Sequence, residues 1–127
     1  MPHRTTRPGE RVWFWGPAVA YMGLIFYLSS LSRLPIGPEV SDKLLHATAY
    51  FGLAIVLVRA LCHGLPARVG PAAAITVWAV ATVFGVSDEV HQMFVPGRTA
   101  ALDDLAADAV GALAGVALCW AWGKMSA

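Results

Sequence analysis

The residues able to do chemistry in this chain are concentrated between residues 87 and 115. This stretch carries five of the eight acidic residues, with a histidine, a glutamine and an arginine, between two long apolar runs. The acidic residues are Asp88, Glu89, Asp103, Asp104 and Asp108. Upstream, Lys43 and His46 stand at the start of another apolar run. Carboxylates near a histidine can exchange a proton with a substrate or bind a cation.

Proton exchange is the first of these chemistries. A carboxylate beside a histidine can act as a general acid and base, and the candidates for these catalytic roles are His46, Glu89 and Asp108. Nucleophilic catalysis has less support, because nothing in the sequence marks the hydroxyl of Ser87 or Thr99 as activated by a base. Whether the chain is an enzyme stays open.

Cation binding is the second chemistry. His46, Glu89, Asp104 and Asp108 would form an oxygen-rich set with one imidazole, which suits Mg²⁺, Ca²⁺ or Mn²⁺ better than structural zinc. The chain contains no H-E-x-x-H or C-x-x-C spacing. From the sequence we therefore expect no metal site and no cofactor.

The composition says which solvent surrounds these residues. Hydrophobic residues make up 57% of the 127 residues and charged residues 13%, against about 25% charged in ordinary soluble domains. The balance favours a single domain that lies in a lipid bilayer. The net charge of +1 and the absence of a Lys/Arg run argue against nucleic acid as a partner. Cys62 and Cys119 lie in apolar surroundings and are expected to be packing residues rather than a disulfide.

Four segments are apolar enough to be transmembrane helices, since crossing about 30 Å of hydrocarbon takes roughly 20 helical residues. They span residues 12–32, 42–61, 69–87 and from 101–103 to 123, with connections that contain Pro and Gly at residues 34–39, 62–69 and 94–98. The first lacks a small-residue cleavage site, so we do not take it for a signal peptide. Ser41 should cap the second helix, and the third should continue past its apolar part to Gln92 or Met93.

Basic residues predict the orientation, because short cytoplasmic loops carry an excess of Lys and Arg. One set of helix ends carries Arg4, Arg7, Arg11, Arg59, Arg68 and Lys124, whereas the other carries Arg33, Lys43 and Arg98 with seven of the eight acids. We therefore predict an all-α integral membrane bundle of four transmembrane helices with the N and C termini cytoplasmic. Its parts are a basic tail over residues 1–11, a helical domain over residues 12–123 and a tail over residues 124–127. Arg59 could extend to water.

The spacing also predicts which polar groups meet. A rise of about 1.5 Å per residue brings the polar residues of the second, third and fourth helices into one layer near the outer face. These are His46, Glu89, Gln92, Asp104 and Asp108. Asp108 shares a helix face with Gly111 and Gly115, whose small-x-x-x-small spacing lets transmembrane helices approach closely. Asp108 should therefore point into the bundle.

Two patterns in these segments resemble a known family. The first is E-x-x-Q-x-F-x-P-x-R followed by two polar positions, at Glu89, Gln92, Phe94, Pro96, Arg98, Asp104 and Asp108. The second is D-K-x-x-H-x-x-x-Y, at Asp42, Lys43, His46 and Tyr50. Together they resemble the VanZ-like family of bacterial membrane proteins, over roughly residues 20–118. The resemblance implies a link to the cell envelope and to glycopeptide (teicoplanin) resistance.

The sequence thus predicts a multi-pass protein of the bacterial cytoplasmic membrane with a polar pocket between its second, third and fourth helices, open to the outer face. The expected ligand-binding residues are Lys43, His46, Tyr50, Glu89, Gln92, Arg98, Asp104 and Asp108. The pocket would bind or modify a lipid-linked or peptidoglycan-related component. Arg98 could hold an anionic group, pair with Glu89 or Asp104, or contact lipid headgroups. A membrane enzyme and a structural accessory subunit remain alternatives, and the oligomeric state stays open.

Overall fold

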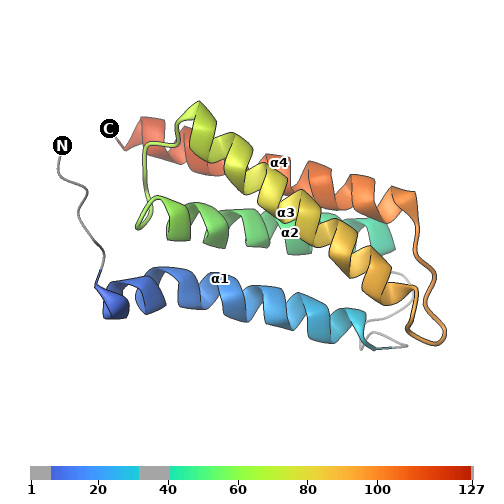
Figure 1. Ribbon diagram of the computed structural model, residues 1–127. Helices are drawn as coiled ribbons and strands as arrows, with labels where there is room; N and C mark the ends of the chain where they lie inside the picture. Colours follow the sequence, from blue (N-terminus) through green and yellow to red (C-terminus); the bar gives the residue numbers. More distant parts are fainter. Residues whose placement is uncertain (1–6, 32–40, 127) are drawn as a thin grey trace.

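A computed structural model of the chain describes residues 7–31 and 41–126, which form a bundle of four helices without a strand (Figure 1). The helices are α1 (Pro8–Ser29), α2 (Asp42–Leu61), α3 (Pro71–Gln92) and α4 (Leu102–Met125). Each is long enough and apolar enough to cross a membrane. This confirms the prediction of an all-α protein with four membrane-spanning helices. The start of α1 and the end of α4 lie at the same end of the bundle.

The start of α1 differs from the prediction, because residues 8–11 are helical rather than part of the basic tail. Pro8 suits the first turn, where a backbone N–H is not needed, and Glu10 places an acid near the positive end of the helix dipole. Hydropathy marks where the apolar run begins, which here is one turn after the helix begins. The helix ends at Ser29, before the predicted residue 32, and the predicted connection at residues 34–39 lies outside the described residues.

A proline inside α1 explains an unexpected contact with α2. Pro17 has no N–H, so the carbonyl of Trp13, four residues earlier, lacks its helical donor. Arg59 of α2 supplies one instead, since its Nη1 donates to the Trp13 carbonyl at 2.9 Å and to the Phe14 carbonyl at 3.3 Å. The sequence indicated only that the half-exposed Arg59 could reach water and did not predict this contact with α1. The Arg59 guanidinium joins the two helices.

The other predicted helix ends agree closely with the structure. The Ser41 hydroxyl accepts from the Leu44 N–H at 3.5 Å and so caps α2 as expected. The third helix does continue beyond its apolar part, to Gln92. The following turn contains Gly97 at a φ of 79°, a conformation that glycine adopts without strain. This turn returns the chain to α4 and brings the start of α4 near the end of α3.

Small residues fix how closely α4 lies against α2, its most extensive neighbour. A side chain at Gly111 would collide with the backbone of Ala47, and one at Gly115 with the backbone of Phe51. The two glycines thus allow backbone-to-backbone contact, as small residues do in membrane helix pairs. This agrees with the predicted packing face and leaves no room for a pocket between α2 and α4.

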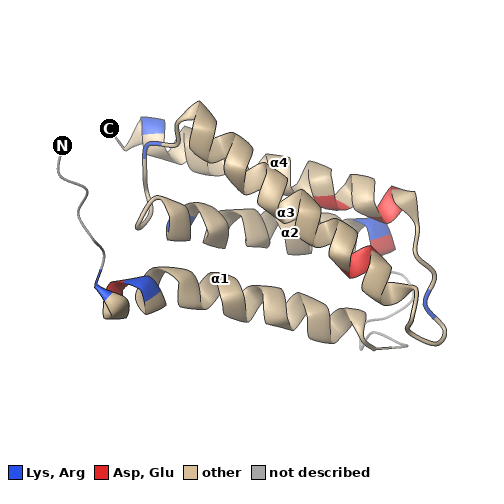
Figure 2. Cartoon of the chain, in the orientation of Figure 1, with Lys and Arg blue, Asp and Glu red and all other residues tan. Residues whose placement is uncertain are grey.

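Charged residues gather at the two ends of the bundle (Figure 2). Between these ends the helices expose large apolar side chains outward, such as Val19, Phe26 and Val83. Apolar faces of this extent are suited to lipid rather than water. Cys62 and Cys119 are both free thiols, as expected.

Candidate functional site

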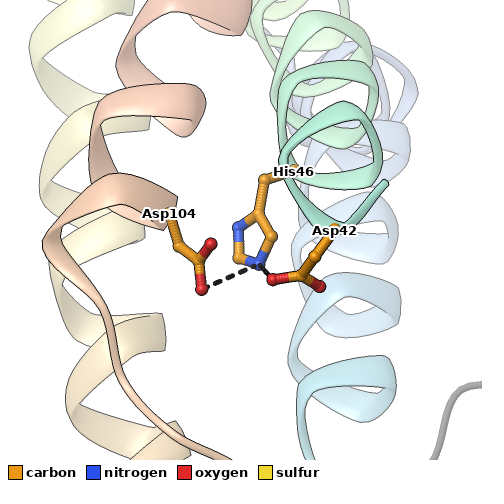
Figure 3. Close-up of side chains that lie close together, drawn as sticks. All are labelled: Asp42, His46 and Asp104. Carbon is orange, nitrogen blue, oxygen red and sulfur yellow. Dashed lines mark ion pairs between the residues drawn. The ribbon is translucent and has the colours of Figure 1, made fainter. Parts of the chain in front are cut away.

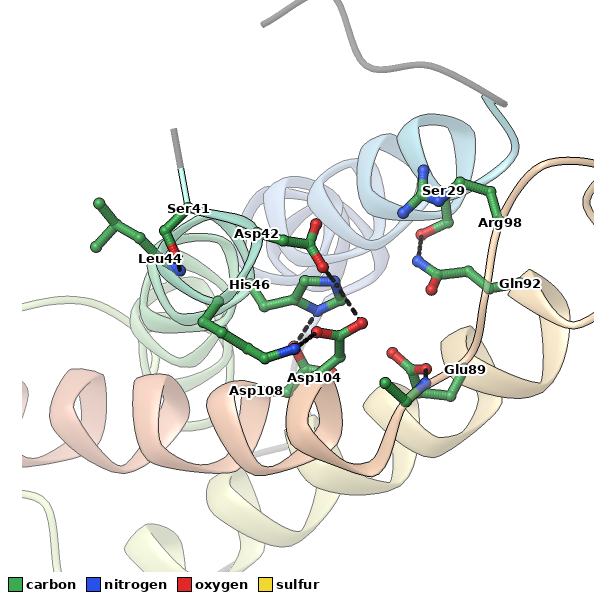
Figure 4. Close-up of polar contacts among 12 residues, drawn as sticks. Ser29, Ser41, Asp42, Leu44, His46, Glu89, Gln92, Arg98, Asp104 and Asp108 are labelled. Carbon is green, nitrogen blue, oxygen red and sulfur yellow. Dashed lines mark hydrogen bonds and ion pairs between the residues drawn. The ribbon is translucent and has the colours of Figure 1, made fainter. Parts of the chain in front are cut away.

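A buried contact between a histidine and a carboxylate lies at the centre of the polar layer. Nδ1 of His46 on α2 is 2.6 Å from Oδ1 of Asp108 on α4 (Figure 4). Asp108 is fully buried and His46 is 8% exposed. The other oxygen of Asp108 lies over Gly85 of α3, where a Cβ would come within 3.0 Å of it. The predicted inward direction of Asp108 and its meeting with His46 are both present.

Two further acids surround the imidazole. Nε2 of His46 lies 3.8 Å from Oδ2 of Asp104 and 3.9 Å from Oδ2 of Asp42, so the ring stands between the two carboxylates (Figure 3). Asp104 also accepts from Nζ of Lys43 at 2.6 Å. Lys43 therefore binds a carboxylate of this layer, and its side chain is half exposed. Asp103, by contrast, is exposed.

Glu89 and Gln92 lie in the same layer on α3, with Glu89 8% exposed and Gln92 2% exposed. Oε2 of Glu89 accepts from the backbone N–H of Ala101 at 3.0 Å, which connects α3 to the start of α4. Its Oε1 has no hydrogen-bond partner among the described residues. The amide of Gln92 faces Ser29 of α1, at 3.5 Å from the hydroxyl. Both side chains are thus buried, as the sequence predicted, rather than solvated at a helix end.

Arg98 forms neither of the two ion pairs that the sequence allowed. Its Nη1 donates to the carbonyl of Leu31 at 3.0 Å, and within the described chain it forms no ion pair with Glu89 or Asp104. Oε2 of Glu89 accepts from a backbone amide instead, and Oδ1 of Asp104 accepts from Lys43. The half-buried guanidinium lies instead at the edge of a cavity.

This cavity has a volume of about 300 Å³ and lies between α1, α2 and α3. Its polar lining is Ser29, Asp42, His46, Thr48, Tyr50, Asp88, Gln92 and Arg98. Its other lining residues are Tyr21, Ile25, Leu28, Leu45 and Ala49. The prediction that the pocket lies between the second, third and fourth helices is corrected here, because α4 packs too closely on α2 and contributes no lining residue.

The cavity separates the predicted ligand-binding residues into two groups. His46, Tyr50, Gln92 and Arg98 line it. The cavity is not lined by the other four, which are Lys43, Glu89, Asp104 and Asp108. His46 contacts two of these, Asp104 and Asp108, from the cavity wall. The Tyr50 hydroxyl is buried without a hydrogen-bond partner in the described chain.

Four polar lining residues were missing from the predicted site: Ser29, Asp42, Thr48 and Asp88. A signal existed for Asp88, which is 3% exposed, because it precedes Gln92 by four residues and so shares its helix face. Asp42 precedes His46 by the same interval. Nothing in the sequence marked Ser29, since its position depends on how α1 packs. His91 does not line the cavity and stacks on Phe26 with ring centroids 4.1 Å apart.

A comparison with models of known protein families identifies the family of this chain. A family model described as VanZ/LLP1 matches residues 12–123. The chain belongs to the VanZ-like family. No curated protein and no solved structure gives a match. The matched region contains all the polar residues that form the buried layer and line the cavity.

Proposed function

We propose that this VanZ-like membrane protein binds an anionic, lipid-linked component of the cell envelope in the cavity between α1, α2 and α3. The observation that carries the proposal is the mixed lining. It combines Arg98, His46 and Gln92 with apolar side chains such as Ile25 and Leu28. A ligand with a charged headgroup and a hydrocarbon chain needs contacts of both kinds.

The charges suggest how a headgroup would be held. Nη1 of Arg98 donates to the Leu31 carbonyl, which holds the guanidinium in place. Its other N–H groups remain available to a phosphate or carboxylate. Asp42 and Asp88 lie across the same cavity and accept hydrogen bonds. They would repel an anion alone, and they favour a headgroup that also carries hydroxyl or amine donors.

A membrane enzyme acting on such a headgroup is the second candidate, and one observation favours it. Asp108 binds Nδ1 of His46 and thereby orients the ring, so that Nε2 is directed toward Asp42 in the cavity wall. A carboxylate that orients a histidine in this way prepares the second nitrogen for proton transfer. His46 would be the general base or acid, and Asp108 would position it.

The location in the cell belongs to the same proposal. With the basic helix ends on the cytoplasmic side, the protein is a multi-pass protein of the bacterial cytoplasmic membrane with its cavity near the outer face. Binding of an envelope precursor there would contribute to teicoplanin resistance. In a cysteine-free background, Thr99→Cys should react with an impermeant thiol reagent on intact cells, and Gly70→Cys should not. Reaction of Gly70→Cys alone would move the cavity to the cytoplasmic side.

Native mass spectrometry of the purified protein tests ligand binding directly. The wild type should retain a lipid of anionic headgroup, and Arg98→Gln should lose at least about tenfold in occupancy, as expected for a bidentate anion contact. Arg68→Gln, an exposed cation at the opposite end, is the matched control and should retain the lipid. Equal retention by all three proteins would contradict the proposed site.

The same variants separate the two candidate functions. His46→Gln should abolish an acid/base reaction on the bound headgroup and leave most of the lipid bound. If lipid occupancy and teicoplanin resistance both follow Arg98 but are indifferent to His46, binding without catalysis accounts for the function. Resistance that is unchanged in Arg98→Gln would separate the cavity from teicoplanin.

A further inference from the structure

One histidine and two buried carboxylates, each from a different helix, converge behind the wall of the cavity. They are His46 of α2, Glu89 of α3 and Asp108 of α4, and one donor atom of each lies within 4.8 Å of the others. From this geometry we infer that the three side chains form a binding site for a divalent cation of the Mg²⁺ and Mn²⁺ class. The inference is independent of the proposed lipid.

The distances suit an ion of this size. An octahedral ion with bonds of about 2.0–2.2 Å has ligands about 3–4.4 Å apart. His46 Nδ1 and Asp108 Oδ1 are only 2.6 Å apart, closer than two ligands of one ion, so the ion would bind Nδ1 together with the unpartnered Oδ2 of Asp108. Small side-chain rotations would complete the set. Three protein ligands leave the remaining positions for water.

Unpartnered oxygens point to the same place. Oε1 of Glu89 and Oδ2 of Asp108 are buried and have no hydrogen-bond partner among the described residues. In each carboxylate the second oxygen is already engaged, by the Ala101 N–H in Glu89 and by His46 in Asp108. A buried oxygen without a donor costs free energy unless a donor or a cation satisfies it. Two such oxygens beside one imidazole are the donors that a cation requires.

The balance of charge favours a cation over another donor. Asp88, Glu89, Asp104 and Asp108 are all at least nine-tenths buried in this layer. Lys43 pairs with Asp104, and His46, when protonated, pairs with Asp108. In the described chain no Lys or Arg forms an ion pair with Asp88 or Glu89. Buried carboxylates stay charged only with such compensation, and a divalent ion supplies it.

Ligand chemistry narrows the class of ion. Two carboxylates and one imidazole suit Mn²⁺ and Mg²⁺, whereas structural zinc takes sulfur and more nitrogen. Asp42, His46 and Asp104 also converge, but Asp42 is exposed and Asp104 is engaged with Lys43. The expectation of no metal site came from the absence of a short motif. A short motif could not have marked the site inferred here, because its three donors come from three helices and are 43 and 19 residues apart.

Titration with Mn²⁺ alone tests this site. The detergent-solubilised protein is stripped with EDTA and then titrated, with free Mn²⁺ followed by its paramagnetic resonance signal. The wild type should bind Mn²⁺ saturably, and Glu89→Gln and Asp108→Asn should each weaken binding at least about tenfold. Asp103→Asn, an exposed acid on the same helix as Asp108, should bind like the wild type.

Folding is checked on the stripped proteins, so that lost binding is not confused with lost structure. Glu89→Gln keeps an oxygen for the Ala101 N–H and should melt like the stripped wild type. Mn²⁺ should raise the melting temperature of the wild type but not of Glu89→Gln. Unchanged Mn²⁺ affinity in a folded Glu89→Gln protein, or no saturable binding by the wild type, would overturn the inference. Loss of binding in Asp42→Asn but not in Glu89→Gln would assign the ion to Asp42, His46 and Asp104 instead.

Discussion

The contact between His46 and Asp108 makes a quantitative prediction about stability. Asp108→Leu keeps the branched shape of the side chain but leaves Nδ1 of a histidine that is only 8% exposed without its partner. A buried polar group that loses its partner costs about 1–3 kcal/mol. His46→Leu leaves the fully buried carboxylate of Asp108 unpaired and should cost more. The double variant removes both groups and should recover part of the loss.

The size of the coupling distinguishes an ion pair from an ordinary polar contact. Hydrogen bonds between membrane helices average about 0.6 kcal/mol in double-mutant cycles, with a maximum near 1.7. Bonds to charged groups contribute about 1.5–3 kcal/mol, and a separation of 2.6 Å is short enough for one. We therefore expect a coupling free energy of about 1.5–3 kcal/mol between the two positions.

Equilibrium unfolding in mixed detergent, with EDTA present to exclude any cation, measures this coupling. The matched control is a cycle between His46 and Asp103, which lies on the same helix as Asp108 but is exposed. That cycle should be additive within about 0.5 kcal/mol. If the His46–Asp108 cycle were equally additive, the two side chains would not be in contact, and the buried layer would have to be abandoned.

Two further predictions concern how the helices pack. Gly111→Ala should lower the free energy of unfolding by about 1–3 kcal/mol, because the added methyl meets the α2 backbone. Ala114→Leu on the exposed side should change it by less than about 0.5 kcal/mol. Equal effects of the two variants would contradict the close α2–α4 contact. Arg59→Met should lower the free energy of unfolding by about 0.5–1.5 kcal/mol. The same change should cost less in a Pro17→Ala background, because the alanine restores the missing helical N–H. A cost unchanged by Pro17→Ala would show that Arg59 stabilises the bundle in another way.

The sequence was sufficient for the class of fold and for the depth of the polar groups. A helix advances by a fixed rise per residue, so the distance along a helix can be counted, and His46, Glu89, Asp104 and Asp108 were placed in one layer by counting alone. Periodicity gave the packing face of α4, since Gly111 must lie on the same side as Asp108. Both are local properties of a single helix.

The neighbour on each side of a helix is not a local property. Ala112 lies about 100° from Gly111 and so off the face that Gly111 shares with Asp108, yet it is fully buried. The fourth helix packs on α3 as well as on α2. The cavity was assigned to the wrong helices for the same reason. Close backbone contact at Gly111 and Gly115 fills the space between α2 and α4, and the wider gap beside α1 becomes the cavity.

What only the tertiary structure decided is therefore the partner of each polar group. The sequence allowed Arg98 to pair with Glu89 or Asp104, but those carboxylates are engaged by Ala101 and Lys43, and the guanidinium binds the Leu31 carbonyl. Partners are chosen by helix rotation and by which hydrogen bonds are already satisfied. Both depend on residues far apart in the chain, which spacing along one helix does not record.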